Sequence, residues 1–372
     1  MKRFFSAVCS LLLTLPLAAF GEAPALGDDA AIAQLPAKQW QLHDLSGAVV
    51  TKVAQITGEN SPNRTQSRFG VWGTDLGSFT VLDGKTYLFG GDTFADDKNG
   101  NWRSNVLFII EDDDPSDGLT ITGAITNAAG TARELLTSQK LDGSEMTVIP
   151  TNLFAANGKL YCIYMSVRHW GGPGEWFCRC SGLAVSEDKG QSWQKLRNVK
   201  WPGTSGFIQT ANAQVGDTMY FWGIPGGRFG GVSLMKAPVA QLEDMDAYAY
   251  YVGLDERGAP RWQQGEEGIA NAALVLDAPV GELSVIYNEH LGNFMMTYLH
   301  QPSQQIMLRE LITPWGPFGD EVVLARGTEY PALYGPFMHP DYVEQGGKCV
   351  YFTMSQYFPI YNIMWMRVVL AE

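Results

Sequence analysis

A hairpin-like segment recurs five times along the sequence, and this repetition constrains the fold more than any other feature. Each copy has an apolar or alternating run, a tight turn containing glycine, and a second run rich in Tyr and Phe. The turns lie near residues 84, 158, 216, 292 and 347. A glycine turn between two strand-like runs is typical of a β-hairpin. The chain is therefore expected to consist mainly of strands.

The spacing of the turns predicts a β-propeller. One blade needs four short strands, or about 40–50 residues plus loops, so five repeats fill almost the whole chain. A β-sandwich is the alternative, but it gives no reason for the same hairpin to recur five times. We predict an all-β, five-bladed β-propeller over residues 46–372, with residues 239–250 as the one plausible short helix.

The first residues have the pattern of a secretory signal peptide. Lys2 and Arg3 precede an uncharged apolar stretch over residues 4–17, and Ala19-Phe20-Gly21 offers a cleavage site of small residues. The stretch is shorter than the roughly 20 apolar residues that a membrane-spanning helix needs. We predict a signal peptide over residues 1–21 and a secreted or periplasmic protein without a transmembrane segment.

Residues 22–45 are expected to form an N-terminal lead-in, loosely held in its Ala-rich part. Removing residues 1–21 takes away two basic residues and no acid, which leaves 24 basic and 39 acidic residues and a net charge of −15. Such a chain repels phosphate backbones, so nucleic acid is not an expected partner. We expect a monomer that acts without a cofactor or a metal.

Four cysteines remain after processing, and an exported compartment permits disulfides. We predict one bridge from Cys162 to Cys178 or Cys180. A second motif, Ser186-Glu187-Asp188-Lys189-Gly190-Gln191-Ser192-Trp193, has the form of the Asp box of sialidase-like propellers. Its Asp closes a turn by accepting hydrogen bonds from backbone N–H groups, so Asp188 is interpreted as a structural residue.

Acid–base chemistry on a sugar needs two carboxyl groups that face each other across the cleaved bond. The densest candidates are Asp75, in Gly73-Thr74-Asp75-Leu76-Gly77, and Asp92, in Phe89-Gly90-Gly91-Asp92-Thr93-Phe94. They flank the first hairpin, and the surrounding glycines let a substrate approach the backbone. Either Asp could instead cap a turn. Glu282 and Glu145 are the reserve candidates.

Polar and aromatic residues in the apolar β context are candidates for binding sugar. A guanidinium held at a glycine turn, as in Gly226-Gly227-Arg228, can form paired hydrogen bonds to hydroxyl or carboxylate groups. Indole rings can stack on sugar rings, although most tryptophans in such a chain pack between blades. The predicted substrate-binding residues are Trp72, Trp170, Arg228, Asn288, His339 and Asn362.

Taken together, these motifs resemble glycoside hydrolase family 183, the endo-D-arabinanases, formerly a bacterial family of unknown function. The resemblance covers roughly residues 50–370. It rests on the two Asp motifs and the Asp box together with Thr57-Gly58, Ile149-Pro150-Thr151, Trp170-Gly171-Gly172-Pro173-Gly174, Gly226-Gly227-Arg228, Gly281-Glu282-Leu283-Ser284-Val285, Gly316-Pro317-Phe318 and Tyr361-Asn362. One departure is the second glycine in Phe-Gly-Gly-Asp, which implies a register difference or a bulge before Asp92.

The resemblance implies a five-bladed propeller that cleaves internal α-D-arabinofuranosyl bonds of D-arabinan, with Asp75 and Asp92 as the catalytic pair. The expected partner is therefore a polysaccharide, D-arabinan or a related glycan. Two alternatives stay open from the sequence. One is another propeller glycosidase such as a sialidase, which needs an arginine cluster and a Tyr nucleophile. The other is a glycan-binding propeller without catalysis.

Overall fold

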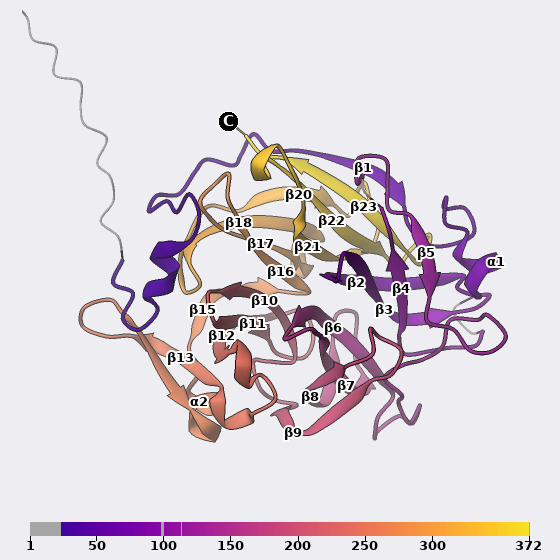
Figure 1. The fold of residues 1–372 in the computed structure, drawn as a ribbon, viewed down its shortest axis with the longest axis horizontal. Coiled ribbons are helices and arrows are strands. Elements are labelled where there is room, and N and C mark those ends of the chain that lie inside the picture. Colours follow the sequence, from indigo (N-terminus) through magenta and orange to yellow (C-terminus); the bar gives the residue numbers. More distant parts are fainter. Residues whose placement is uncertain (1–23, 98–99, 113, 372) are drawn as a thin grey trace, which may run out of the picture.

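The computed structural model describes residues 24–371 apart from residues 98, 99 and 113. The predicted signal peptide lies outside the described residues. The strands form five antiparallel sheets arranged around a common centre (Figure 1). The predicted all-β propeller is therefore confirmed.

Five strands, one from each sheet, form the inner ring. β2 lies beside β6 and β21, β10 lies beside β6 and β16, and β16 lies beside β21, so the ring closes on itself. The inner strands are β2 (Gly73–Leu82), β6 (Thr147–Ala156), β10 (Gln209–Val215), β16 (Leu283–Asn288) and β21 (Leu333–Glu344). Their ends define the two mouths of the central channel.

The other strands continue each sheet outward. The first two sheets add β3 (Lys85–Phe94), β4 (Val106–Ile110) and β5 (Ile121–Ala124), and β7 (Lys159–Trp170), β8 (Trp176–Ser186) and β9 (Gln194–Pro202). The third adds β11 (Thr218–Ile224), β12 (Gly230–Pro238), β13 (Ala249–Leu254), β14 (Pro260–Gln264) and β15 (Leu274–Val280). The fourth adds β17 (Asn293–His300), β18 (Gln305–Thr313), β19 (Gly316–Phe318) and β20 (Val322–Arg326).

The fifth sheet is closed by both ends of the chain. It adds β22 (Cys349–Gln356), β23 (Asn362–Val369) and, outermost, β1 (Val49–Gln55). β1 pairs antiparallel with β23, from Val49 opposite Val369 to Gln55 opposite Met364. Hydrogen bonds between the first and last strands thus hold the ring shut (Figure 1).

Each of the five predicted hairpins joins an inner strand to the second strand of its sheet. The turn residues explain the first two. Asp83 and Gly84 have φ of 52° and 72°, and Asn157 and Gly158 have φ of 52° and 71°. Two successive positive φ angles match the right-handed twist of hairpin strands, and Asp-Gly and Asn-Gly adopt them readily.

The predicted helix at residues 239–250 is wrong. Only two short 3₁₀ turns occur there, Val239–Gln241 and Met245–Ala247, before strand β13. Tyr248 and Tyr250 are buried within the sheet, and burial between sheets overrides the local preference. The helices are α1 (Thr65–Phe69), α2 (Gly265–Asn271) and further 3₁₀ turns at Ala30–Gln34, Gln301–Ser303 and Gln345–Gly347. No helix among the described residues is long and apolar enough to cross a membrane.

The predicted disulfide is also wrong, because all four described cysteines are free. On β7, Cys162 lies opposite Ala184, whereas Cys180 lies opposite Ser166. Four residues of strand at about 3.3 Å each place Cys162 about 13 Å from that position, well beyond the ~7 Å between Cα atoms that a disulfide spans.

The described part of the lead-in is held firmly rather than loosely. Asp29 is buried and accepts hydrogen bonds from Tyr220 Oη at 2.5 Å and Trp262 Nε1 at 2.9 Å, and it pairs with Lys236. Farther along, the backbone N–H of His43 donates to the buried Glu310 at 2.7 Å. The lead-in is therefore anchored to the third and fourth sheets before it enters β1.

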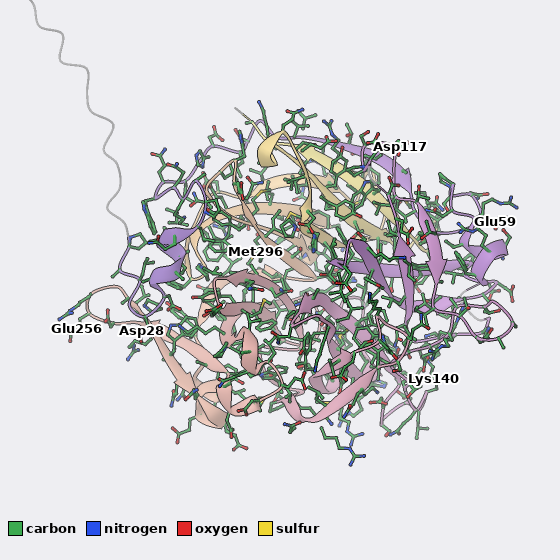
Figure 2. The ribbon with its side chains drawn as sticks, viewed as in Figure 1. Asp28, Glu59, Asp117, Lys140, Glu256 and Met296 are labelled. Atoms are coloured by element: carbon green, nitrogen blue, oxygen red, sulfur yellow. The ribbon has the colours of Figure 1, made fainter. Side chains whose placement is uncertain are left out.

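Side chains between the sheets form the core. Trp201, Trp222 and Trp365 are fully buried. Figure 2 shows Met296 of β17 inside the molecule, while charged residues such as Glu59 and Glu256 lie around its outline. The Asp box at residues 186–193 has the structural role expected of it, because Asp188 accepts hydrogen bonds from the N–H and hydroxyl of Ser192.

Candidate active site

A cavity of about 790 Å³ opens at the mouth of the channel where the inner strands begin. Asp75 lies near the start of β2, Glu282 directly before β16, and Tyr334 near the start of β21. Asp92 lines the cavity from β3 and Arg228 from the loop between β11 and β12. The structure thus brings together two predicted acids, one reserve acid and a predicted binding residue.

Two β-bulges direct Asp75 into this cavity. Thr74 pairs with Thr93 and Leu76 with Gly90, so the single residue Asp75 lies opposite the two residues Gly91 and Asp92. The pairing shifts again before Ser78, where Leu76 and Gly77 adopt positive φ of 60° and 88°. Bulges re-aim side chains and are common beside active sites. The extra glycine before Asp92 is therefore a bulge rather than a register difference.

The Asp75 side chain is half-buried, and its two carboxyl oxygens lie in different surroundings. Its Oδ2 accepts a hydrogen bond from Tyr334 Oη at 2.9 Å, while Oδ1 has no partner. Burial, reinforced by the nearby negative charge of Asp92, raises the pKa of Asp75 to about 7, against the opposing effect of hydrogen bonds from Tyr361 and Tyr334.

Asp92 is also half-buried, but more hydrogen-bond donors with defined geometry contact it. Its Oδ1 accepts hydrogen bonds from Trp102 Nε1 and Thr147 Oγ1, each at 2.7 Å. Burial raises the pKa of Asp92 to about 6, and the hydrogen bonds from Thr147 and Trp102 oppose the shift. Neighbouring carboxyls with raised pKa values near neutrality can divide the roles of acid and base between them.

Glu282 and Arg228 form a buried ion pair at the same site. Glu282 Oε1 accepts from Arg228 Nε at 2.9 Å and Nη2 at 2.8 Å, whereas Glu282 Oε2 has no partner. The guanidinium lies 4.7 Å from the ring centroid of Tyr334 and 5.4 Å from that of Trp176. The site thus contains two unpaired buried carboxylate oxygens, on Asp75 and Glu282.

Of the predicted aromatic residues, Trp170 lines the cavity, at the tip of the β7–β8 hairpin, where it is 36% exposed. Trp72 does not line it. Glu145 lies outside as well and accepts a hydrogen bond from Ser166 Oγ at 2.7 Å. This reserve candidate is therefore hydrogen-bonded to a side chain of β7 and does not line the cavity.

Three more predicted binding residues lie away from the cavity. Asn288 holds a turn, since it donates to Gly347 O at 2.8 Å and accepts from Leu291 N at 3.0 Å. Asn362 accepts from Thr57 Oγ1 at 2.9 Å. His339 lines a separate cavity of about 260 Å³ farther along the inner strands, where burial lowers its pKa to about 4.

Several residues at the site were not predicted, notably Tyr334, Trp102 and Thr147, which touch the two Asp side chains. Tyr361 also lines the cavity, next to the predicted Asn362. The motif Tyr361-Asn362 thus identified the right segment but the wrong side chain. Among the described residues, no three His, Cys, Asp or Glu side chains are placed to hold a metal ion.

Gly91 gives a local test of this geometry. A Cβ built on Gly91 overlaps Asp75 Oδ1 and lies 3.1 Å from the Leu76 side chain. Gly91→Ala is therefore expected to displace the Asp75 carboxyl and lower turnover by about tenfold, part of the 10²–10⁴-fold effect of a positioned acid or base. Steady-state kinetics measures the effect.

Gly123→Ala is the matched control in the same sheet. A Cβ at Gly123 meets only Ile109, at 4.0 Å, which is an ordinary contact. This variant should keep wild-type turnover. Equal turnover for the two variants contradicts the close approach of Asp75 to the Gly91 backbone.

Comparisons with other proteins agree with the fold. The family described as a domain of unknown function (DUF4185) matches residues 60–367. No curated protein matches the sequence. Similar solved structures include a protein from Bacteroides ovatus ATCC 8483 described as a candidate hydrolase, at 14% identity and a TM-score of 0.59, covering 88% of this chain and 93% of that one.

A second similar structure is that of an exo-β-1,3-galactanase from Phanerochaete chrysosporium with β-1,3-galactotriose. It has 9% identity and a TM-score of 0.52, and the match covers 86% of this chain and 64% of that one. At these identities the similarity shows a shared fold.

Proposed function

The chain belongs to the family of the domain of unknown function DUF4185, and on that premise we propose that it is a glycoside hydrolase. We propose further that it is an endo-D-arabinanase, a furanosidase that cuts internal α-D-arabinofuranosyl bonds of D-arabinan. Counting each of the five sheets as one blade, the catalytic unit is a five-bladed propeller.

The observation that carries this proposal is the pair of half-buried carboxyls, Asp75 and Asp92, which line one cavity from adjacent strands. One carboxyl donates a proton to the leaving glycosidic oxygen. The other carboxyl is ionised, and it either takes a proton from the attacking water or attacks the anomeric carbon itself. In both cases one water is consumed overall: one product gains its proton and the other gains its hydroxyl group. The pKa values of about 7 and about 6 suit this division near neutral pH.

Exposed aromatic rings on two sides of the cavity support action on a polymer. Trp170 lies on the second sheet, and Tyr357, which follows β22 in the fifth sheet, is 53% exposed. These two sheets flank the first sheet, which carries the Asp pair. A glycan lying across both rings has sugars bound on each side of the cleaved bond, as an endo-acting enzyme requires.

A sialidase is less well supported. Arg228 is the one arginine among the described residues that line the cavity, and it is paired with Glu282. An arginine cluster for a sugar carboxylate is therefore not formed by this part of the chain. The similarity in fold to the galactanase adds support for a glycosidase but leaves the glycan to be determined by assay.

The test is expression of the full chain with its own N terminus, followed by assay of the exported protein on D-arabinan. The expected products at early times are oligosaccharides of mixed length, and the intact mass should show a mature chain that begins between Glu22 and Leu26. Release of single arabinose units alone indicates an exo-enzyme. Binding of D-arabinan without any cleavage indicates a glycan-binding propeller.

Tyr357→Ala tests the polymer-binding role of the exposed ring. Loss of one stacking surface is expected to raise KM for D-arabinan by about fivefold to tenfold, given an aromatic contact worth about 1 kcal/mol, with kcat nearly unchanged. The lengths of the early products should shift as well.

Phe177→Ala is the control for Tyr357→Ala. Phe177 is similarly exposed, at 55%, but does not line the cavity. The KM of the Phe177→Ala variant for D-arabinan should match that of the wild type. A KM for Tyr357→Ala within twofold of the wild type argues against a glycan contact at this ring.

A further inference from the structure

A lysine reaches Asp92 from a segment that no motif singled out. Residues 125–146 connect β5 to β6, and Lys140 lies at the periphery in Figure 2. Its ammonium group pairs with Glu134 Oε2 at 2.9 Å and contacts Ser104 Oγ. Both contacts hold the ammonium in place beside Ser104.

The first connection from Lys140 to Asp92 runs through two hydroxyl groups. Thr147 Oγ1 lies 2.9 Å from Ser104 Oγ and 2.7 Å from Asp92 Oδ1. The Lys140 ammonium can only donate, so Ser104 Oγ accepts from it. The Ser104 hydroxyl then has its own proton to donate, either to Thr147 Oγ1 or to Ser138 Oγ at 3.0 Å. When Ser104 donates to Thr147, the Thr147 hydroxyl donates to Asp92 Oδ1, and this hydrogen bond stabilises the ionised form of the Asp92 carboxyl.

The second connection runs through an indole ring. Lys140 Nζ lies 4.0 Å from the centroid of the Trp102 ring, and Trp102 Nε1 donates to Asp92 Oδ1 at 2.7 Å. A cation over an aromatic face draws electron density from the ring. This polarisation strengthens the N–H as a donor, so both connections favour negative charge on the same oxygen.

From this geometry we propose that Lys140 is a positioning residue that orients Asp92 and favours its ionised form. Building on the proposed function, this assigns the two carboxyls: Asp92 is the base or nucleophile, and Asp75 is the proton donor. Asp75 fits the role of proton donor because its Oδ1 has no hydrogen-bond partner and its Oδ2 accepts from a neutral tyrosine hydroxyl, that of Tyr334.

Other charged and titratable groups also face this site. Glu134 in the connecting segment carries negative charge that raises the pKa of Asp92, and the charge of Asp92 in turn raises the pKa of Asp75 on β2. Tyr361 faces both Asp side chains. Glu282 is offset by Arg228. Lys140 is thus the cation that acts on Asp92 from the described residues around it.

The test compares Lys140→Met, which keeps an apolar stem against Trp102, with Lys140→Arg, which keeps the charge. Two quantities are measured against pH: kcat/KM on D-arabinan, and the NMR shift of the Trp102 indole proton in the protein without substrate. Lys140→Met should move the acidic limb of the rate profile and the Trp102 midpoint to higher pH, each by about half to one unit. The rate then falls severalfold more at pH 5 than at pH 8.

Two controls separate charge from structure. Lys140→Arg should leave both midpoints close to those of the wild type. Lys85→Met removes a cation from β3 that pairs with Glu111 and lies outside the cavity, and it should change neither midpoint. If Lys140→Met lowers the rate by the same factor at every pH and leaves the Trp102 midpoint unchanged, the proposal is overturned. A shift confined to the basic limb overturns the assignment of Asp92 as the base.

The indole titration needs no turnover, so the two proposals can fail separately. A wild type that cleaves no glycan refutes the proposed function, yet the Trp102 midpoint still decides whether Lys140 acts on Asp92. An unchanged midpoint in an active Lys140→Met enzyme refutes the role of Lys140 alone.

Discussion

Replacing Asp75 or Asp92 with Asn is expected to lower turnover on D-arabinan by about 10²-fold or more, the scale of general acid–base catalysis. Each change removes a carboxyl from the cavity while keeping the shape of the side chain. The amide of Asn can still accept from Tyr334 at position 75 and from Trp102 at position 92. Both variants should therefore fold.

The stability of the wild type relative to Asp75→Asn should depend on pH in a defined direction. The pKa of Asp75 is raised from its usual value of 3.8 to about 7 by burial, so the folded protein binds this proton more tightly than the unfolded chain. Its contribution to stability is then fully present below about pH 4 and is lost as the pH rises to about 7. The wild type thus loses stability over this range and Asp75→Asn does not.

The gain of Asp75→Asn over the wild type at pH 8 is expected to be up to a few kcal/mol, since each pKa unit is worth about 1.4 kcal/mol. Denaturant unfolding at pH 4 and pH 8, together with turnover, measures both effects. Asp188→Asn in the Asp box is the control: it replaces one of the two acceptor oxygens of the turn by an NH₂ group, so it should lower the melting temperature and leave turnover intact. If both cavity variants retain turnover within a few-fold, the catalytic pair lies elsewhere.

Arg228→Met is expected to cost about 3–5 kcal/mol of folding stability, because it leaves a buried charge without its partner. The side chain of Glu282 is only 5% exposed and receives two hydrogen bonds from Arg228. Met preserves most of the volume against Tyr334 and Trp176. The loss is therefore mainly electrostatic.

The double variant Arg228→Met with Glu282→Gln should recover most of this loss, because the unpaired charge is gone. Urea unfolding of the two single variants and the double variant gives the coupling free energy directly. A loss of less than 1 kcal/mol for Arg228→Met shows that water or rearrangement compensates Glu282, and that the pair contributes little to the fold.

Local patterns in the sequence were sufficient for the hairpins and for the segments that form the cavity. Asp-Gly and Asn-Gly turns encode their own geometry, and the glycines around Asp75 and Asp92 mark places where the backbone bulges. These signals depend on neighbours in the chain, which is why they could be read from one sequence.

The partners of the two Asp side chains could not be predicted in the same way. Tyr334 lies 259 residues from Asp75, and Thr147 lies 55 residues from Asp92. Such pairs depend on how the sheets are arranged around the channel. The same applies to Glu282, which the sequence offered as a reserve acid and the structure pairs with Arg228.

The two wrong structural predictions have related causes. The cysteines were judged by compartment and spacing, but the register of β7 against β8 separates them. The segment at residues 239–250 was judged by composition, but Tyr248 and Tyr250 are buried between sheets, and Tyr250 pairs with Met235 of β12. Tertiary packing decided both.

The pairing of β1 with β23 has a consequence for how the chain reaches its folded state. Residues 49–55 are synthesised more than 300 residues before their partners at residues 364–369. Contacts between residues so far apart in sequence are slow to form. Until the last strand arrives, the outer edge of the fifth sheet stays open to pairing with another chain. A nascent or partly translocated chain can therefore assemble most of its sheets, but the order in which the two ends meet sets the final, closing step of folding.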